Sequence, residues 1–359
     1  MGKLRAVVIG CGGRGKAHAL AYKEAKDVSF VAFAEPAQDR AEKMSEEYPR
    51  ARAYKDYRKM LREEKPDVVA VCTWPKDHKK MVLAAVRSGA RLINAEKPMA
   101  PTYGEALSMH RACEKAGVMC TYSHQRRFAP EFVKARALLR EGAIGKLQRI
   151  EGRCPNLFDW GTHWFDMMFF FNEQTPALWV MGQIDVAQES LVFGATLETQ
   201  GVSYVTFENG VNGLLTTGSG NWGNDVNAML PGGGILLVGE EGRMTMHARN
   251  CPLEVRRMGR RKAERPDLSK VRTLHKSDSV AGVLDSLAAL KAKKEPELSS
   301  RKALMATELI FATYESSRRR GRIDLPLKAK DSALLGMIEA REIGYTLKAI
   351  SPRGRRSRA

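Results

Sequence analysis

The sequence has few cysteines, and none is placed to build a metal site or a disulfide framework. Six of its 359 residues are Cys, no two of them in Cys-x-x-Cys spacing, and most lie inside apolar segments. In a chain of this length, such cysteines are typical of small buried side chains. We therefore expect no bound metal, and we expect a reducing compartment, the cytoplasm.

Long apolar runs are also missing. The longest candidates, such as residues 167–171, are far shorter than the roughly 20 residues of a membrane-spanning helix. The N-terminus enters a strand-like run almost at once and lacks the features of a secretory signal. With 43% hydrophobic and 28% charged residues, the composition excludes a largely disordered or fibrous protein. We expect a soluble protein with no membrane partner.

Positive charge is in excess, with 59 Lys and Arg against 41 Asp and Glu, a net charge of +18. Part of the excess lies in the tail 352–359 and in Arg318-Arg319-Arg320; the remaining basic residues alternate with acidic ones, as on solvated helix faces. Helix-turn-helix, zinc-finger and RNP-type motifs are absent from the sequence. We expect no specific nucleic-acid partner and only a weak attraction to polyanions.

The first third of the chain alternates short apolar runs with helical patterns. Expected strands cover 4–10, 28–34, 68–72, 91–95 and 118–122, and expected helices cover 14–26, 37–47, 54–64, 77–88 and 102–116. Alternation at this rhythm predicts βαβ units and a parallel sheet that is covered on both faces. The fold class is therefore α/β, with an N-terminal doubly wound sheet of the Rossmann type.

The pattern changes at about Ser123. Helices are expected at 129–141, 159–172, 278–292 and 301–317, and strands at 146–153, 177–184, 201–207, 211–218, 234–238 and 243–247. This order predicts an α+β domain with a large, mainly antiparallel sheet, and an exposed basic loop over 254–275. We divide the chain into a dinucleotide-binding domain (1–122), a substrate-binding and oligomerisation domain (123–330) and an extension with the basic tail (331–359).

A glycine-rich motif, Gly10-Cys11-Gly12-Gly13-Arg14-Gly15, ends the first strand and opens a helix. Its glycines allow a tight turn, close approach of a pyrophosphate and close packing of helix on strand, and the helix N-terminus faces the phosphates. Glu35 ends the second strand 20 residues after Gly15, where a carboxylate accepts hydrogen bonds from a ribose diol. These residues predict binding of NAD, with NADP less favoured.

Two further strands end in polar motifs at the same edge of the sheet. Glu96-Lys97-Pro98 follows the fourth strand, and Thr73 and Trp74 follow the third, with His78 close behind. Carboxyl ends of parallel strands are where ligands meet an open α/β sheet, so we expect all of these residues at the cofactor crevice. A surface ion pair at Glu96 and Lys97, and a helix-start role for His78, are the structural alternatives.

Asp159, His163 and Asp166 share one stripe of the predicted helix 159–172, at i, i+4 and i+7. Two carboxylates and an imidazole are costly to bury in an apolar helix unless they pair or do chemistry. Either His163 is a buried structural histidine, or the three residues belong to a site. Trp160 and Trp164 on this helix are either an apolar platform for a sugar ring or ordinary core.

These motifs, together with Gln125-Arg126-Arg127-Phe128 and Asp-x-Gly-x-His-x-x-Asp, occur in the order seen in the Gfo/Idh/MocA oxidoreductases, and the chain resembles that family over about residues 4–320. The resemblance implies a nicotinamide cofactor, a sugar, cyclitol or polyol substrate, and a homodimer or homotetramer formed through the second domain. It also implies that Lys97 contacts the reacting oxygen, that His163 is the acid/base, and that Asp166 holds the substrate or orients the base.

From the chemistry, we expect hydride transfer between nicotinamide and a carbinol carbon, with His163 moving the proton and Lys97 stabilising the developing alkoxide. Asp159 or Asp166 would orient the imidazole, and Arg126 would reach the substrate unless it forms a structural ion pair. Two other functions stay open. One is a redox-neutral, NAD-dependent glycoside hydrolase or lyase that acts through a transient keto-sugar; the other is a non-catalytic NAD-binding regulator.

Overall fold

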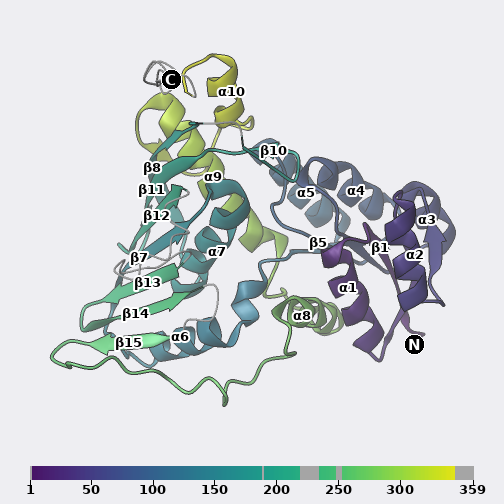
Figure 1. The fold of residues 1–359 in the computed structure, drawn as a ribbon, viewed down its shortest axis with the longest axis horizontal. Helices are drawn as coiled ribbons and strands as arrows, with labels where there is room; N and C mark the ends of the chain where they lie inside the picture. The colour runs from purple at the N-terminus through teal and green to yellow at the C-terminus, as the bar shows by residue number, and fades with distance from the viewer. Residues whose placement is uncertain (1, 188–189, 219–233, 248–252, 344–359) are drawn as a thin grey trace, which may run out of the picture.

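The computed structural model describes residues 2–187, 190–218, 234–247 and 253–343. Cys251 and the basic tail 352–359 lie outside these residues. Figure 1 shows two halves side by side, with a parallel sheet in the N-terminal half and a larger sheet in the other. Within the described residues, every helix is too short or too polar to span a bilayer.

The N-terminal half is a six-stranded parallel sheet in the order β3-β2-β1-β4-β5-β6. Its strands are β1 (Leu4–Ile9), β2 (Val28–Ala34), β3 (Arg52–Tyr54), β4 (Val68–Val71), β5 (Leu92–Ala95) and β6 (Met119–Tyr122). The helices between them are α1 (Gly13–Glu24), α2 (Gln38–Glu47), α3 (Tyr57–Glu64), α4 (Pro75–Arg87) and α5 (Tyr103–Ala116). This confirms the predicted doubly wound sheet. The short strand β3 was not predicted, because two of its three residues are exposed and it has no apolar run.

The second half is an eight-stranded sheet in the order β15-β14-β13-β7-β12-β11-β8-β16. Its strands are β7 (Leu147–Cys154), β8 (Ala177–Asp185), β11 (Gln200–Phe207), β12 (Asn212–Gly218), β13 (Gly234–Gly239), β14 (Gly242–His247), β15 (Glu254–Arg257) and β16 (Ile323–Asp324), with β9 (Leu191–Val192) and β10 (Ala195–Thr196) forming a separate hairpin. Only β7 and β12 among these neighbours run parallel. The predicted, mainly antiparallel sheet is confirmed.

Helices of the second half pack against one face of this sheet. They are α6 (Pro130–Arg140), α7 (Thr162–Phe171) and α9 (Ser300–Arg319), and the short α10 (Ala333–Glu339) packs on α9. Met181, Val202 and Tyr204 on strands β8 and β11 remain exposed. Assembly of copies through this sheet stays a prediction.

Several of the sequence-based expectations for the second half differ from the structure. The expected loop 254–275 begins with strand β15, because Val255 is buried and pairs with Met244 although charged residues flank it. The expected helix 159–172 is a π-helical turn, Leu157–Gly161, followed by α7. Helix α10 lies in the segment for which no element was predicted.

Helix α8 (Asp278–Ala292) returns to the N-terminal half. Val280, Val283 and Leu287 join the apolar cluster on one face of the parallel sheet, and Ser286 Oγ accepts a hydrogen bond of 2.8 Å from Asn94 Nδ2 on β5. Figure 1 shows α8 beside α1. The chain therefore crosses between the halves more than once, and segments far apart in sequence meet where the halves join.

Candidate active site

The glycine turn after β1 leaves the start of α1 open. Gly10 has a φ of +92°, and a Cβ there would lie 2.6 Å from the carbonyl oxygen of Cys72; at Gly15 a Cβ would lie 2.0 Å from the Gly10 oxygen. Gly12 and Gly13 face open space. Gly12 caps α1 without a side-chain hydrogen bond, so the first N–H groups of the helix remain available to an anion.

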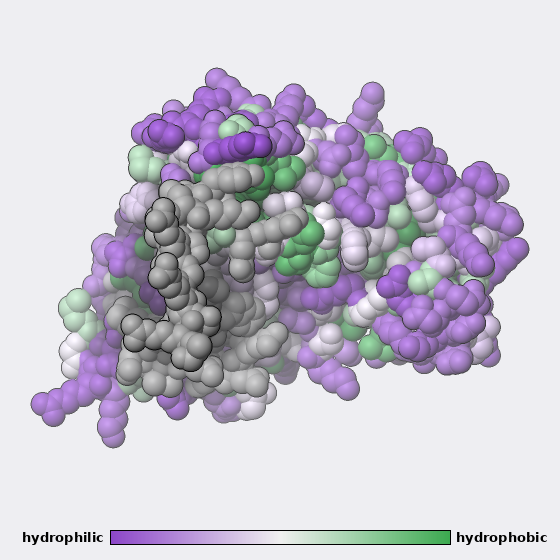
Figure 2. All heavy atoms as spheres, turned by 45° about the horizontal axis from the view of Figure 1, so that its top comes forward, coloured by the Kyte–Doolittle hydropathy of each residue, from purple (hydrophilic) through white to green (hydrophobic). Residues whose placement is uncertain are grey.

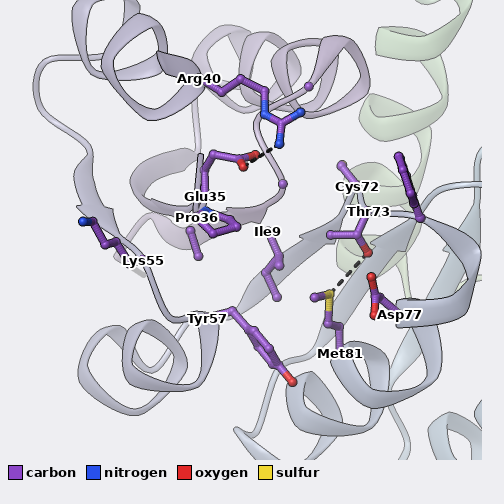
Figure 3. Close-up of a pocket in the computed structure, with 14 residues that line it drawn as sticks. Ile9, Glu35, Pro36, Arg40, Lys55, Tyr57, Cys72, Thr73, Asp77 and Met81 are labelled. Atoms are coloured by element: carbon purple, nitrogen blue, oxygen red, sulfur yellow. Dashed lines mark hydrogen bonds and ion pairs between the residues drawn. The ribbon is translucent and has the colours of Figure 1, made fainter. Parts of the chain in front are cut away.

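A cavity of about 310 Å³ opens at the carboxyl ends of β1, β2 and β4. Figure 3 shows its lining residues, among them Glu35, Arg40, Tyr57, Thr73 and Asp77. Gly10 and Gly12 form part of its wall. The cavity therefore connects the phosphate-binding turn with the end of β2, as an adenosine diphosphate moiety requires.

Glu35 is held rigidly at this cavity. Its carboxylate accepts hydrogen bonds from Cys11 N (2.8 Å) and Ala37 N (3.0 Å), and it forms an ion pair with Arg40 at 3.0 Å. Burial and the charge of Glu35 raise the pKa of the Cys11 thiol to about 12, so that thiol stays neutral. Arg40 is occupied by Glu35, and the arrangement fits a ribose diol better than a 2′-phosphate.

The end of β4 contributes Thr73 and Trp74 to the cavity wall. His78 has another position: it is fully buried, with Nδ1 3.1 Å from Met99 O and Nε2 3.0 Å from Thr73 O. It therefore joins the loop after β4 to the loop after β5. The structure places His78 behind the crevice and not in it.

The end of β5 carries Glu96 and Lys97, whose side chains diverge. Glu96 lies 3.1 Å from His18 Nε2 and 3.8 Å from Arg14 Nε, on the α1 side. Lys97 Nζ donates to Asp159 Oδ1 at 2.7 Å and to Asp159 O at 3.0 Å. Because Asp159 belongs to the second half, this contact joins the two halves at the crevice.

The π-helical turn presents Asp159 to Lys97. Asn156 Oδ1 accepts from Asp159 N at 2.7 Å and from Trp160 N at 3.2 Å, so it caps the turn. Beneath it, the buried carboxylate of Glu198 accepts from Leu157 N and from Tyr314 Oη. The turn is therefore fixed from both sides.

His163 lies in the first turn of α7 and is buried. Burial, with the positive charges of Lys97 and Arg126, holds its pKa well below the ordinary 6.5. His163 is therefore neutral near pH 7 and can accept a proton. Its Nδ1 has no hydrogen-bond partner in the described part of the chain.

His124 is a residue that the sequence reasoning missed. Its ring stands edge-on to His163 with centroids 5.6 Å apart, and its Nε2 lies 2.8 Å from Thr162 Oγ1. Burial lowers its pKa to about 4. The available signal was its position just after β6, at the same edge of the sheet as Lys97.

Asp166 does not contact His163. Arg127 Nε and Nη2 donate to its two oxygens at 2.9 and 2.8 Å, and Arg127 Nη1 reaches Glu297 at 2.8 Å. The expectation that Asp159 or Asp166 orients the imidazole is thus corrected by the structure: Asp159 pairs with Lys97 and Asp166 with Arg127. Both pairings satisfy buried charges that would be costly alone.

Arg126 lies over two aromatic rings of the second half. Its guanidinium carbon is 5.3 Å from the ring centre of Trp160 and 4.7 Å from that of Trp164. Burial lowers its pKa to about 10. Lys97, Asp159, His163 and Arg126 thus lie close together where the two halves join, while the glycine turn and Glu35 border the cavity in the N-terminal half.

Comparison with known proteins agrees with this geometry. The model of an oxidoreductase family with an NAD-binding Rossmann fold, GFO_IDH_MocA, matches residues 4–124. D-apiose dehydrogenase of Paraburkholderia graminis is 26% identical over 348 residues, which are 90% of each chain. Myo-inositol 2-dehydrogenase of Thermotoga maritima is 27% identical over 202 residues, 52% of this chain and 60% of that protein.

Solved structures share the fold. Levoglucosan dehydrogenase in complex with NADH and levoglucosan superposes with a TM-score of 0.75 at 19% identity, covering 90% of this chain and all of that one. The likeness therefore extends over both halves. The N-terminal half is an NAD-binding Rossmann fold, as the glycine turn and Glu35 predict.

Proposed function

We propose that this chain, whose residues 4–124 match the GFO_IDH_MocA oxidoreductase family model, is an NAD-dependent dehydrogenase that oxidises a secondary hydroxyl of a sugar, cyclitol or related polyol. The observation that carries the proposal is the contact of 2.7 Å between Lys97 Nζ and Asp159 Oδ1, beside a neutral His163. The ammonium of Lys97 comes from one half and the imidazole of His163 from the other, and the two lie close enough for the charge of Lys97 to lower the pKa of His163.

NAD, when bound, supplies the acceptor for the hydride that leaves the carbinol carbon. Gly12 and Gly13 leave room for its phosphates, and Glu35 accepts hydrogen bonds from its adenosine ribose. Thr73 and Trp74 form the wall of the same cavity.

The proton of the hydroxyl goes to His163. A base with a lowered pKa is unprotonated over the whole neutral range, so the imidazole is ready to accept before each turnover. Lys97 donates a hydrogen bond to the substrate oxygen and stabilises its developing negative charge, and Asp159 holds the ammonium in place. Trp160 and Trp164 offer apolar surface to the sugar ring.

The test is a panel of polyols and sugars with NAD, read at the NADH absorbance band. Turnover of one or more polyols is expected, with stoichiometric NADH. Retained dinucleotide without NADH formation on any member of the panel would contradict the proposal.

Lys97→Met sharpens the test, with Lys79→Met as the matched control on the exposed side of α4, where Lys79 pairs with Glu105 at 3.8 Å. We expect kcat/KM to fall by roughly 10²–10³-fold in Lys97→Met, with the Kd for NAD nearly unchanged. The control should keep full activity. Equal activity of the two variants would remove Lys97 from the chemistry.

A further inference from the structure

Arg126 lies beside the residues to which the proposed function gives the chemistry. It belongs to the single 3-10 turn Gln125–Phe128 that follows β6, and its guanidinium covers the rings of Trp160 and Trp164. These two residues flank His163 in sequence. The charge of Arg126 also contributes to lowering the pKa of His163, so the two groups share one electrostatic environment.

Among the described residues, Arg126 has no ion-pair partner, in contrast to its neighbour Arg127. Arg127 is matched by Asp166 and Glu297, both at 2.8 Å. No carboxylate in the described ranges lies within 4.0 Å of Arg126, and its Nε is buried with no hydrogen-bond partner there. A desolvated cation without a partner is costly, and here the cost appears as a pKa lowered to about 10.

The other cations of the cleft are already balanced. Lys97 is paired with Asp159 at 2.7 Å, and Arg14 lies 3.8 Å from Glu96. Arg126 is therefore the charge that an incoming ligand would neutralise. Its planar guanidinium can bind two oxygens of one group at once.

We propose that the substrate carries a carboxylate that pairs with Arg126, which makes it a sugar acid of the uronic or aldonic class. The proposal rests on the proposed function for where the ligand binds. Asp278 and Glu131 lie close enough to act on Arg126 electrostatically, and they would disfavour a phosphate dianion more than a carboxylate monoanion.

The carboxylate takes no part in the redox step. Bound NAD would accept the hydride of the carbinol carbon, His163 would take the hydroxyl proton, and the C–O single bond would become a carbonyl. The product is a keto sugar acid with its carboxylate intact. Pairing with Arg126 would fix which hydroxyl lies beside Lys97.

The experiment compares matched probes: D-glucuronate with D-glucose, and D-gluconate with D-glucitol. Calorimetry measures their binding to the enzyme saturated with NAD, and NADH absorbance measures turnover. We expect each acid to bind at least about tenfold more tightly than its neutral partner. Arg126→Gln should raise the KM or Kd for the acids roughly 10- to 100-fold and change those for the neutral partners far less.

Arg140→Gln is the control for net charge. Arg140 is an exposed residue of α6 that pairs with Glu173, so its loss should leave the acids unaffected. Arg126→Lys should restore part of the affinity. Weak binding of all acids, equal effects of Arg126→Gln on acids and neutral probes, or tighter binding of D-glucose 6-phosphate than of D-glucuronate would each overturn the proposal.

The two proposals fail in different ways. Sugar acids that bind through Arg126 but never yield NADH would support the carboxylate site and contradict the dehydrogenase. Neutral polyols oxidised with NADH formation, together with acids that bind wild type and Arg126→Gln equally well, would support the dehydrogenase and overturn the carboxylate site.

Discussion

In the Rossmann half, the groups that would face NAD follow one another closely along the chain, whereas in the sheet half, which holds the eight-stranded sheet, the carboxylates of the site are fixed by partners far away in the sequence. Gly10, Gly12 and Glu35 lie within 26 residues and meet through the parallel pairing of β1 and β2. Asp159 is held by Lys97, 62 residues away, and Asp166 by Arg127, 39 residues away. Figure 2 shows the exterior of the Rossmann half covered mainly by hydrophilic side chains.

The difference shows that cofactor binding depends on residues close together in the sequence, whereas the chemistry depends on tertiary contacts. A change in the glycine motif or Glu35 should therefore alter only the affinity or preference for the cofactor. A change in the sheet half should alter rate, folding or both, because its charges were buried as pairs.

The sharpest test is His163→Ala. Loss of the proton acceptor should lower kcat/KM by roughly 10²–10⁴-fold while the Kd for NAD stays unchanged, since the imidazole is in the sheet half. Because its pKa is held below 6.5, the acidic limb of the wild-type pH–rate profile should lie below pH 6.5. A loss confined to thermal stability would instead make His163 a structural residue.

Arg127→Met should have the next largest effect, on stability. It leaves the buried carboxylate of Asp166 without its partner, and we expect the free energy of unfolding to fall by about 3–5 kcal/mol in urea titrations. Arg136→Met, which removes a less buried arginine paired with Glu173, is the control and should cost far less. An equal loss of unfolding free energy in the two variants would contradict the expectation that the buried pair matters more than the surface pair.

Glu198→Gln should change how stability depends on pH. Burial raises the pKa of Glu198 to about 7 from an ordinary 4.5. The folded state therefore binds this proton more tightly than the unfolded one, and the stability it contributes is complete below pH 4.5 and is lost as pH rises through 7. Between pH 5.5 and pH 8, the Tm of the variant should fall less than that of the wild type. An equal fall of Tm in the two proteins would contradict a raised pKa of Glu198.

Glu35→Gln should have the smallest effect. The Kd for NAD should rise roughly tenfold, and the preference for NAD over NADP should narrow, because the carboxylate no longer repels a 2′-phosphate and Arg40 is released. Glu47→Gln, at an exposed pair with Lys16, is the control. An unchanged preference would mean that another residue contacts the ribose.

The fold and the cofactor could be predicted from the sequence because their signals are local. An apolar run such as 28–34 predicts a buried strand, and the glycine motif predicts a tight turn, from a few neighbouring residues. The structure confirms the strand and the turn, and the family match confirms the NAD-binding fold. Strands β3 and β15 were not predicted, because they are stabilised by pairing with a neighbouring strand and their own composition is not typical of a strand.

The partners of the site residues could not be predicted in the same way. Helical spacing correctly puts His163 and Asp166 one turn apart, but it does not say that Arg127 takes the carboxylate. The π-helical turn also separates Asp159 from the register assumed for a continuous helix. His124 was not predicted as a site residue, because a single histidine after a strand is more often structural. Its contact with the ring of His163 is visible only in the folded chain.

Helix α8 has a practical consequence for cutting this protein into parts. Residues 1–122 produced alone would leave uncovered the side of the parallel sheet against which Val280, Val283 and Leu287 pack, and Asn94 would lose Ser286. We expect such a fragment to aggregate when it is produced alone, and to stay in solution when a peptide of residues 278–292 is added to cover the exposed apolar face. A dinucleotide-binding fragment that is stable on its own would therefore have to combine residues 1–122 with residues 278–292, two stretches that are far apart in the sequence.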